Sequence, residues 1–203
     1  MKKLRIRLFV TMALDPAVTN QSYSNASGFT VNGTSEDDTW YTLLADPFKG
    51  QPDQVVERAC LHAIQYKPQV MSCEDIAAQR MYLPLLREAF EKYGIKCAVV
   101  PYKYSTRLSK HARITSLQPR AKSGKWYFRK GYCDALIRQM LQYPEGDDDL
   151  IDSMVQHTQI ARPFKDYRRD EDDLDFDPDD EDFDGDQFRL NGTFVGKMGS
   201  RYK

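Results

Sequence analysis

The first apolar segment of the chain limits most strongly how it can fold. Residues 4–14 read Leu-Arg-Ile-Arg-Leu-Phe-Val-Thr-Met-Ala-Leu, so an early alternation passes into a continuous apolar run. A run of this kind is typical of a strand that becomes central in a sheet, because both of its faces are then buried. The run ends at Asp15-Pro16, a pair that stops a strand. Whatever else the chain forms must therefore build outward from this strand.

The segments that follow predict a mixed sheet. Two further strand patterns, at residues 28–33 and 39–45, are separated by the turn-rich residues 32–38 and extend the first strand into a three-strand meander. Helical and strand periods then alternate at 54–66, 70–73, 80–93 and 96–100. Strand, helix and strand with short connections imply a parallel extension of the meander. Asp53 is expected to cap the first of these helices, and Gly94 to end the second.

A strongly basic segment comes next. Residues 103–130 contain nine Lys or Arg and no Asp or Glu. We expect a short helix at 110–117, a strand of an appended β-hairpin at 125–128, and a helix at 134–141. A last helix should begin at the acidic residues 147–149 and run to about residue 159. An acid-free segment of this length favours a nucleic-acid partner, because Lys and Arg that neutralise phosphates supply most sequence-independent affinity.

The charge of the chain is divided between two regions. Residues 1–163 hold 22 basic and 17 acidic side chains, whereas residues 164–203 hold 7 and 13. Residues 170–186 alone include twelve acids, which is too polar for a packed core. The sequence therefore predicts one compact domain at 1–163 and a disordered acidic C-terminal tail at 164–203. Within the tail, Asp180-x-Asp182-x-Asp184-Gly185 starts like an EF-hand loop, but the twelfth position is Asn191, so a calcium site is not expected.

Three acidic positions share one structural setting. Asp15 and Glu74 each follow the end of a predicted strand, and Asp147–Asp149 stand at the entrance to a helix. The carboxyl ends of parallel strands open onto one crevice, so these side chains can converge there. Converging carboxylates repel one another unless a cation holds them together. Taken singly, each acid is more simply read as a turn or helix-cap residue; together they predict a divalent-metal site.

Other patterns narrow the class of protein. The four cysteines form no C-x-x-C pair, which indicates reduced and mostly buried thiols. The start of the chain lacks the apolar core of a signal peptide, and no segment is apolar over the length of a membrane span. A cytoplasmic protein is therefore expected, with no membrane partner. No G-x-x-x-x-G-K-[ST] motif occurs, so this chain carries no ATPase motif of that type.

Two motifs resemble those of the nuclease domain of the tailed-bacteriophage terminase large subunit. Residues 143–153, Tyr-Pro-Glu-Gly-Asp-Asp-Asp-Leu-Ile-Asp-Ser, resemble its segment of Pro-x-Gly, an Asp pair, two apolar residues and a further Asp. Residues 110–119, which begin Lys-His-Ala-Arg-Ile, and the following 123–128 look like its Lys-x-x-Arg-Ile segment and hairpin. The resemblance covers about residues 4–160. It implies an RNase H-like α/β fold, in which helices flank a mixed central sheet.

The resemblance also implies an activity and its residues. The expected activity is endonucleolytic cutting of double-stranded viral DNA concatemers during genome packaging, with two Mg²⁺ or Mn²⁺ ions. Asp15, Glu74 and one or both of Asp149 and Asp148 would be catalytic metal ligands, with Asp149 favoured over Asp148. Asp152 would be an auxiliary metal ligand. Asp75 could exchange roles with Glu74. The expected DNA-binding residues are Lys103, Arg107, Lys110, Arg113, Arg120, Lys122, Lys125, Arg129 and Lys130.

Partners and alternatives follow from the same resemblance. A terminase ATPase, a small terminase subunit and a portal protein are expected partners besides DNA. Another RNase H-like nuclease, of the junction resolvase or integrase type, is the main alternative, and a non-catalytic DNA-binding packaging module is another. His111 and His157 are expected to be incidental, although His157 follows Asp149 by two turns and could line the cleft. The aromatic residues among the basic ones are expected to pack in the protein rather than to stack on bases.

Overall fold

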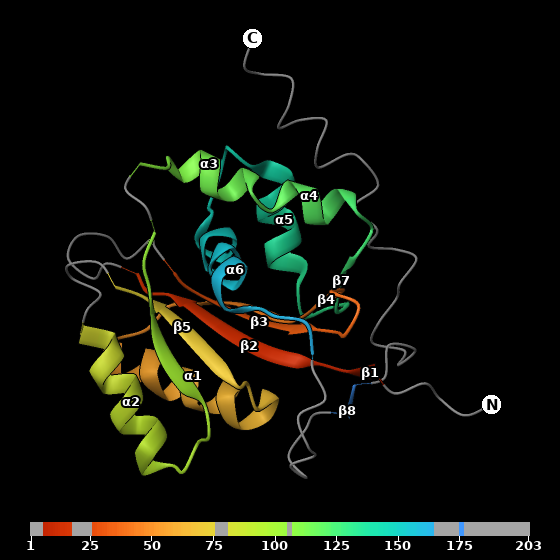
Figure 1. Ribbon diagram of the computed structural model, residues 1–203. Helices are drawn as coiled ribbons and strands as arrows, with labels where there is room; N and C mark the ends of the chain where they lie inside the picture. Colours follow the sequence, from red (N-terminus) through yellow and green to blue (C-terminus); the bar gives the residue numbers. More distant parts are fainter. Residues whose placement is uncertain (1–5, 18–25, 76–80, 105–106, 165–174, 177–203) are drawn as a thin grey trace.

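The structure is a computed structural model that describes residues 6–17, 26–75, 81–104, 107–164 and 175–176. The helices lie in two layers, one on each side of a central sheet (Figure 1). The strands are β1 (Ile6–Arg7), β2 (Phe9–Asp15), β3 (Ser27–Thr34), β4 (Trp40–Phe48), β5 (Val70–Glu74), β6 (Ala98–Tyr102), β7 (Trp126–Phe128) and β8 (Asp175–Phe176). The helices are α1 (Pro52–Tyr66), α2 (Tyr82–Lys92), α3 (Lys110–Thr115), α4 (Gln118–Lys122), α5 (Asp134–Gln142) and α6 (Asp149–Ile160).

The central sheet has six strands in the order β6-β5-β2-β3-β4-β7. Strands β2, β3 and β4 pair antiparallel, as the predicted meander requires. Strand β5 pairs parallel to β2, and β6 parallel to β5, so the predicted parallel extension is confirmed as well. The result is the mixed α/β sheet expected from the sequence. Strand β2 has neighbours on both sides, as its apolar run indicated.

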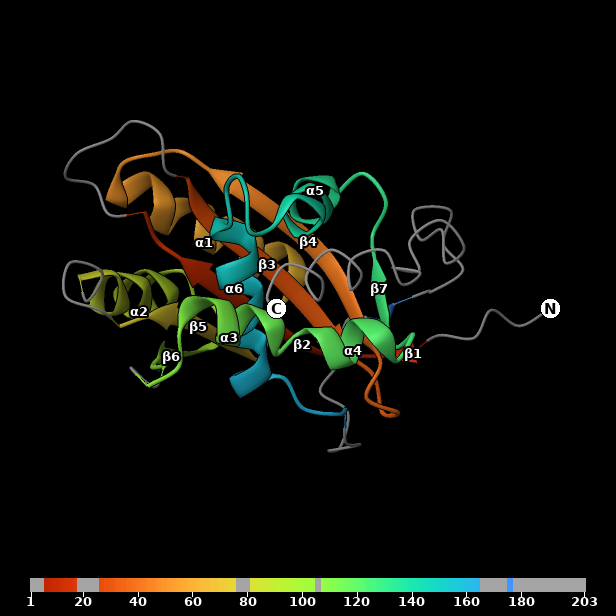
Figure 2. The same ribbon diagram turned by 90° about the horizontal axis from the view of Figure 1, so that it is seen from above.

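Two hydrophobic clusters separate the layers. One lies under α1 and α2 and includes Met12, Phe29, Met71, Leu86 and Phe90, all nearly or fully buried. The other lies on the opposite face, where α6 packs on the sheet and α3, α4 and α5 cover it, as Figure 2 shows from above. Helix α6 thus has protein on nearly every side, which explains why eight of its residues are buried.

Several local predictions were wrong. Helix α1 begins after Gln51 rather than Asp53, because Pro52 takes the first helical position and the Gln54 side chain accepts from the Gln51 backbone N–H at 2.9 Å. The helix predicted at 110–117 ends at Thr115, and α4 starts a new turn at Gln118-Pro119.

The β-hairpin expected around residues 125–128 does not form in the described part of the chain. These residues give a single edge strand, β7, that pairs parallel to β4 through Trp40↔Trp126. The edge-to-face contact of these two rings, with centroids 5.7 Å apart, and the Trp126 indole hydrogen bond to Thr42 hold β7 in that register. Tertiary packing therefore overrides the local hairpin pattern.

The predicted acidic tail lies almost wholly outside the described residues, and so does the EF-hand-like segment. Residues 175–176 are the exception, since they form β8 and pair antiparallel to β1. Disorder of the tail and the domain boundary at residue 163 stay predictions. The four cysteines are free thiols and three are buried, as expected. No helix among the described residues has the length and apolar character needed to cross a bilayer.

Candidate metal centre

Three chain segments bring acidic side chains to one edge of the sheet. Asp15 is the last residue of β2 and Glu74 the last of β5. These strands are parallel, with Leu14 opposite Cys73, so the two acids follow at the same level. Helix α6 starts with Asp149 close to this edge, and Asp152 lies one turn further along. The convergence that the sequence predicted for Asp15, Glu74 and the acidic helix start is therefore present.

Gly28 is what allows α6 to approach the sheet so closely. It lies on β3 directly opposite Asp15. A Cβ at this position would run into the backbone carbonyl of Asp149, and the next nearest atom is also backbone. The first turn of α6 therefore lies on a strand position that has no side chain. Sequence reasoning missed this residue, since Gly28 read only as the start of a strand.

The carboxyl groups of Asp15 and Glu74 are in direct contact. Burial raises the pKa of Asp15 well above its ordinary value, and a side-chain hydrogen bond to Glu74 together with the charge of Glu74 raises it further. The charges of Asp152 and Asp149 act in the same direction. All of these effects favour the protonated form of Asp15, as expected for carboxylates that cannot all ionise at close range.

The three consecutive aspartates have different environments. Asp147 is exposed to solvent. Asp148 is the N-cap residue of α6, and its Oδ1 accepts from Lys110 at 2.7 Å rather than capping the helix. Asp149 faces the Asp15 side, where it accepts from the backbone of Ala26 and adds to the field on Asp15. The geometry therefore distinguishes Asp149 from its neighbours, which the sequence alone left open.

Lys110 places a positive charge beside the acids. Its Nζ lies 2.7 Å from Asp148 Oδ1 and 2.7 Å from Asp152 Oδ2. Burial lowers the pKa of Lys110, but the hydrogen bonds to Asp148 and Asp152 and the charges of these two carboxylates outweigh burial and raise it overall. The other oxygen of Asp152, Oδ1, is buried and has no hydrogen-bond partner among the described residues. One acceptor atom at the centre is thus left open.

The contacts of Glu74 and its neighbour Asp75 distinguish the roles of the two acids. Glu74 bonds to Asp15, whereas the Asp75 carboxylate lies 3.6 Å from Lys103 Nζ. The Asp75 backbone N–H donates to the Tyr102 carbonyl at 3.1 Å, which continues the β5–β6 ladder. These contacts favour Glu74 over Asp75 as the member of the acidic centre.

The chemistry of this donor set fits a divalent cation, although the side chains do not already form a cage for one. Among the residues that the structure describes, no three His, Cys, Asp or Glu side chains are arranged to hold a metal ion. A cation here would bind the open Oδ1 of Asp152 and reduce the repulsion between Asp15 and the neighbouring carboxylates. Carboxylate oxygens are the ligands that Mg²⁺ and Mn²⁺ prefer. Deprotonation of Asp15 and a turn of Asp152 away from Lys110 would make these oxygens available to a cation.

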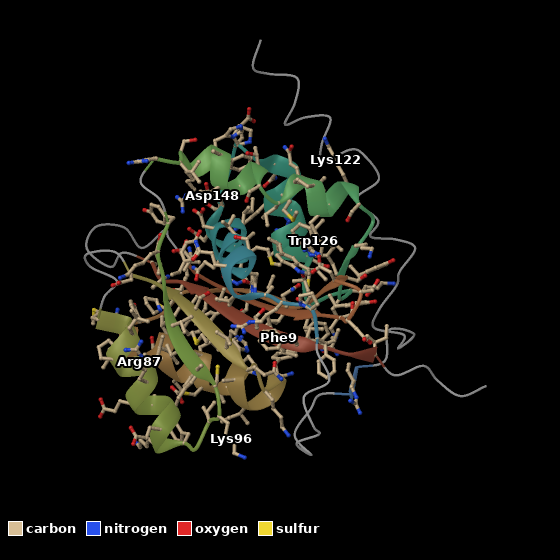
Figure 3. The ribbon with its side chains drawn as sticks, in the orientation of Figure 1. Phe9, Arg87, Lys96, Lys122, Trp126 and Asp148 are labelled. Atoms are coloured by element: carbon tan, nitrogen blue, oxygen red, sulfur yellow. The ribbon has the colours of Figure 1, made fainter. Side chains whose placement is uncertain are left out.

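Part of the basic segment borders the acidic edge. Lys103 follows β6 and is 72% exposed, and Lys110 is partly exposed beside α6. The Arg113 guanidinium lies 3.8 Å from the centre of the Tyr104 ring. Burial raises the pKa of Asp152, and the charge of Arg113 partly offsets that rise. Figure 3 shows Asp148 at α3 and α6, whereas Arg87 and Lys96 lie on the other side of the sheet. Three of the nine predicted DNA-binding residues therefore lie at the candidate site.

Other members of the basic segment lie elsewhere. Arg120 pairs with Asp38 at 2.9 Å, and Lys125 lies 3.6 Å from Asp37 Oδ2. Both aspartates belong to the turn before β4, which runs parallel to β2, so this turn lies at the edge opposite Asp15. The structure thus separates Arg120 and Lys125 from the acids. Lys122 is exposed on neighbouring α4 (Figure 3). Arg107, Arg129 and Lys130 are exposed or partly exposed.

His157 does not line the cleft. It is fully buried between α6 and the sheet, where Nδ1 contacts the Thr11 hydroxyl at 2.7 Å and Nε2 the Thr30 hydroxyl at 3.0 Å. Burial lowers the pKa of His157 to about 3, so the ring is neutral. His111 stacks on Tyr143, with ring centroids 5.8 Å apart. Both contacts are structural, in keeping with the incidental role expected for these histidines.

Asp149 gives the centre a measurable pH dependence. Burial, followed by the charges of Asp148 and Asp147, raises the pKa of Asp149 from 3.8 to about 6. Because the folded pKa lies above the unfolded one, this group favours the fold below pH 3.8, and the contribution is lost as the pH rises through 6. In metal-free buffer, we expect the melting temperature of Asp149→Asn minus that of wild type to become more positive as the pH rises from 4 to 7. A difference that stays constant over this range would contradict the assignment.

Comparisons with known proteins agree with this architecture. No protein-family model matches the sequence, and no curated protein matches it. Among solved structures, the human cytomegalovirus terminase nuclease domain superposes with a TM-score of 0.54 at 14% identity, over 75% of this chain and 82% of that one. The fowlpox virus resolvase in complex with Holliday junction DNA has a TM-score of 0.50 at 10% identity, over 74% and 97%. The chain therefore has an RNase H-like α/β fold, which resembles the folds of a viral terminase nuclease domain and a viral junction resolvase.

Proposed function

We propose that this protein is a metal-dependent endonuclease that cuts double-stranded viral DNA, in the role of a terminase nuclease during genome packaging. The observation that carries the proposal is the convergence of Asp15, Glu74 and Asp149 from two strand ends and a helix start. The motifs at residues 110–119 and 143–153, which resemble those of phage terminases, support the terminase role. The similarity in fold to a viral terminase nuclease domain also supports the terminase role.

Each acidic residue has a part in the proposed chemistry. Asp15, Glu74 and Asp149 would hold two Mg²⁺ or Mn²⁺ ions, and Asp152 would add a ligand through its open oxygen. When bound, the ions would activate a water molecule and stabilise the oxygens of an in-line phosphodiester displacement. Asp148 keeps Lys110 at the rim of the centre, where its ammonium group can meet a phosphate. No histidine is needed as a general base in this scheme.

The substrate would approach from the side of α3. Lys103, Lys110 and Arg113 border the acids there and would neutralise DNA phosphates. Arg107, Lys122, Arg129 and Lys130 would extend this contact, whereas Arg120 and Lys125 would act chiefly within the protein, as their pairs with Asp38 and Asp37 indicate. A terminase ATPase, a small terminase subunit and a portal protein are the proposed partners, in the cytoplasm of an infected cell.

Digestion of plasmid DNA tests the proposal. Supercoiled and linear plasmid are incubated with the protein in Mn²⁺, in Mg²⁺ and in EDTA. We expect both DNA forms to be cut with metal and neither to be cut in EDTA. Binding of DNA that survives EDTA, together with no cleavage under any metal, would instead identify a non-catalytic packaging module.

A junction resolvase is the second candidate, because the chain is also similar in fold to a resolvase that was solved with junction DNA. A synthetic four-way junction is therefore included beside a linear duplex of the same sequence. Cleavage of the junction with the linear duplex spared would favour the resolvase. Equal cleavage of both favours the terminase role.

A further inference from the structure

Polar side chains line the face of α6 that lies on the sheet. Ser153, Gln156 and His157 are at most 1% exposed, and their spacing places them on one helix face. Ser153 Oγ donates to the Ala13 carbonyl at 3.1 Å and contacts the Thr30 hydroxyl at 2.8 Å. A buried helix face on a sheet is usually apolar, so each of these groups requires its partner to offset desolvation. The helix is thereby joined to the sheet at defined atoms.

Gln156 connects the elements that carry the acids. Its Nε2 donates to the Leu14 carbonyl at 2.9 Å, and its Oε1 accepts from the Ser72 hydroxyl at 2.8 Å. Leu14 directly precedes Asp15, and Ser72 precedes Glu74 by two residues. Gln156 itself follows Asp152 by one helical turn. From α6, the Gln156 amide thus bonds to β2 close to Asp15 and to β5 close to Glu74.

We infer that Gln156 is a positioning residue for the metal centre: through its bonds to β2 and β5 it sets where α6 holds Asp149 and Asp152 relative to Asp15 and Glu74. Apolar contacts such as those of Leu150 and Met154 fix how deeply the helix is buried but tolerate sliding along the strands. Hydrogen bonds to fixed backbone and hydroxyl atoms do not tolerate it. The inference rests on the proposed nuclease function, because it concerns the same carboxylates.

The amide is the one group of this size that meets both partners. A glutamate at position 156 could accept from Ser72 but would direct a second oxygen at the Leu14 carbonyl. A methionine keeps the shape and loses both bonds. Gln159 offers a matched control, since it is a glutamine on the same helix, is exposed, and donates to the Lys103 carbonyl at 3.1 Å. The printed bonds of Ser153 and His157 go to β2 and β3, whereas Gln156 bonds to both β2 and β5, the strands that carry Asp15 and Glu74.

The test compares Gln156→Glu and Gln156→Met with Gln159→Met and wild type. Mn²⁺ affinity of the DNA-free protein is measured by calorimetry, the rise in melting temperature on adding Mn²⁺ by circular dichroism, and duplex affinity in EDTA by anisotropy. Ser72→Ala, which deletes one hydroxyl, serves as a milder variant if a Gln156 variant does not fold. A cooperative melt in metal-free buffer establishes that a variant is folded.

We expect the folded Gln156 variants to bind Mn²⁺ roughly 10–100-fold more weakly, as outer-shell substitutions do at metal sites. Their metal-induced rise in melting temperature should shrink, while duplex affinity in EDTA stays at the wild-type value and Gln159→Met behaves as wild type throughout. Wild-type Mn²⁺ affinity in a folded Gln156 variant, or a parallel loss of Mn²⁺ and duplex binding, would overturn the inference. Failure of the wild-type protein to bind Mn²⁺ would instead count against the proposed nuclease function.

Discussion

Replacing Asp15 with Asn should abolish metal-dependent DNA cleavage and at the same time raise the melting temperature of the metal-free protein at pH 8. The carboxylate of Asp15 is buried against Glu74, and both burial and that neighbour raise its pKa. An amide removes the repulsion and can still hydrogen-bond Glu74, but it is a poor ligand for Mg²⁺ or Mn²⁺. The loss of cleavage should exceed the roughly 10–100-fold effect of an outer-shell substitution.

The neighbouring acids provide the control for this experiment. Glu74→Gln should behave like Asp15→Asn, whereas Asp75→Asn should cut plasmid at close to the wild-type rate, because Asp75 contacts Lys103 rather than Asp15. Cleavage is followed by gel assay under Mn²⁺, with melting curves recorded on the same preparations. An active Asp15→Asn protein, or equal losses in Asp75→Asn and Glu74→Gln, would refute this arrangement of the centre.

Gly28→Ala should give the other large effect, because the added methyl group meets backbone rather than a movable side chain. The Cβ would collide with the Asp149 carbonyl, so the first turn of α6 must move away from Asp15. Overpacking of this kind costs about 1–3 kcal/mol. A misplacement near 1 Å can reduce a rate by about 100-fold. We therefore expect urea denaturation at lower concentration and a loss of cleavage that is larger than the stability change explains.

Gly33→Ala is the matched control on the same strand. Its Cβ would meet the Leu8 side chain, which can shift, and Gly33 pairs with Val10 rather than with Asp15. Gly33→Ala should lower stability and leave plasmid cleavage in Mn²⁺ near wild type once the folded fraction is taken into account. If both variants lost cleavage in proportion to their stability, the close approach at Gly28 would have no special part in the centre.

The sequence predicted best those elements that produce a short-range hydrophobic period. The apolar run before Asp15 and the alternation of strands and helices led to the observed meander and its parallel extension. The end of a strand also located Asp15 and Glu74 correctly, because strand ends in a parallel pair share an edge. These features depend on residues that are close in the sequence, so their patterns survive without knowledge of the fold.

What the sequence did not predict depends on contacts between distant segments. Strand β7 joins β4 because Trp126 packs on Trp40, which no local hairpin pattern reveals. The sequence predicted Lys110 as one of nine DNA-binding residues, but its contacts with Asp148 and Asp152 depend on the fold. Gln156 did leave a signal, since a polar residue recurs with Ser153 and His157 on the inner face of an apolar helix. Its partners on β2 and β5 could be identified only from the fold.

The order of the acids along the chain has a consequence for how the protein matures. Asp15 and Glu74 come from its first part, while α6, with Asp149 and Asp152, is the last helix among the described residues. During synthesis the β2–β5 pair can form before α6 has left the ribosome, but the acids of that pair then face solvent without the helix that completes the centre. If the protein is the proposed nuclease, it would become able to cleave DNA only after α6 docks on the sheet.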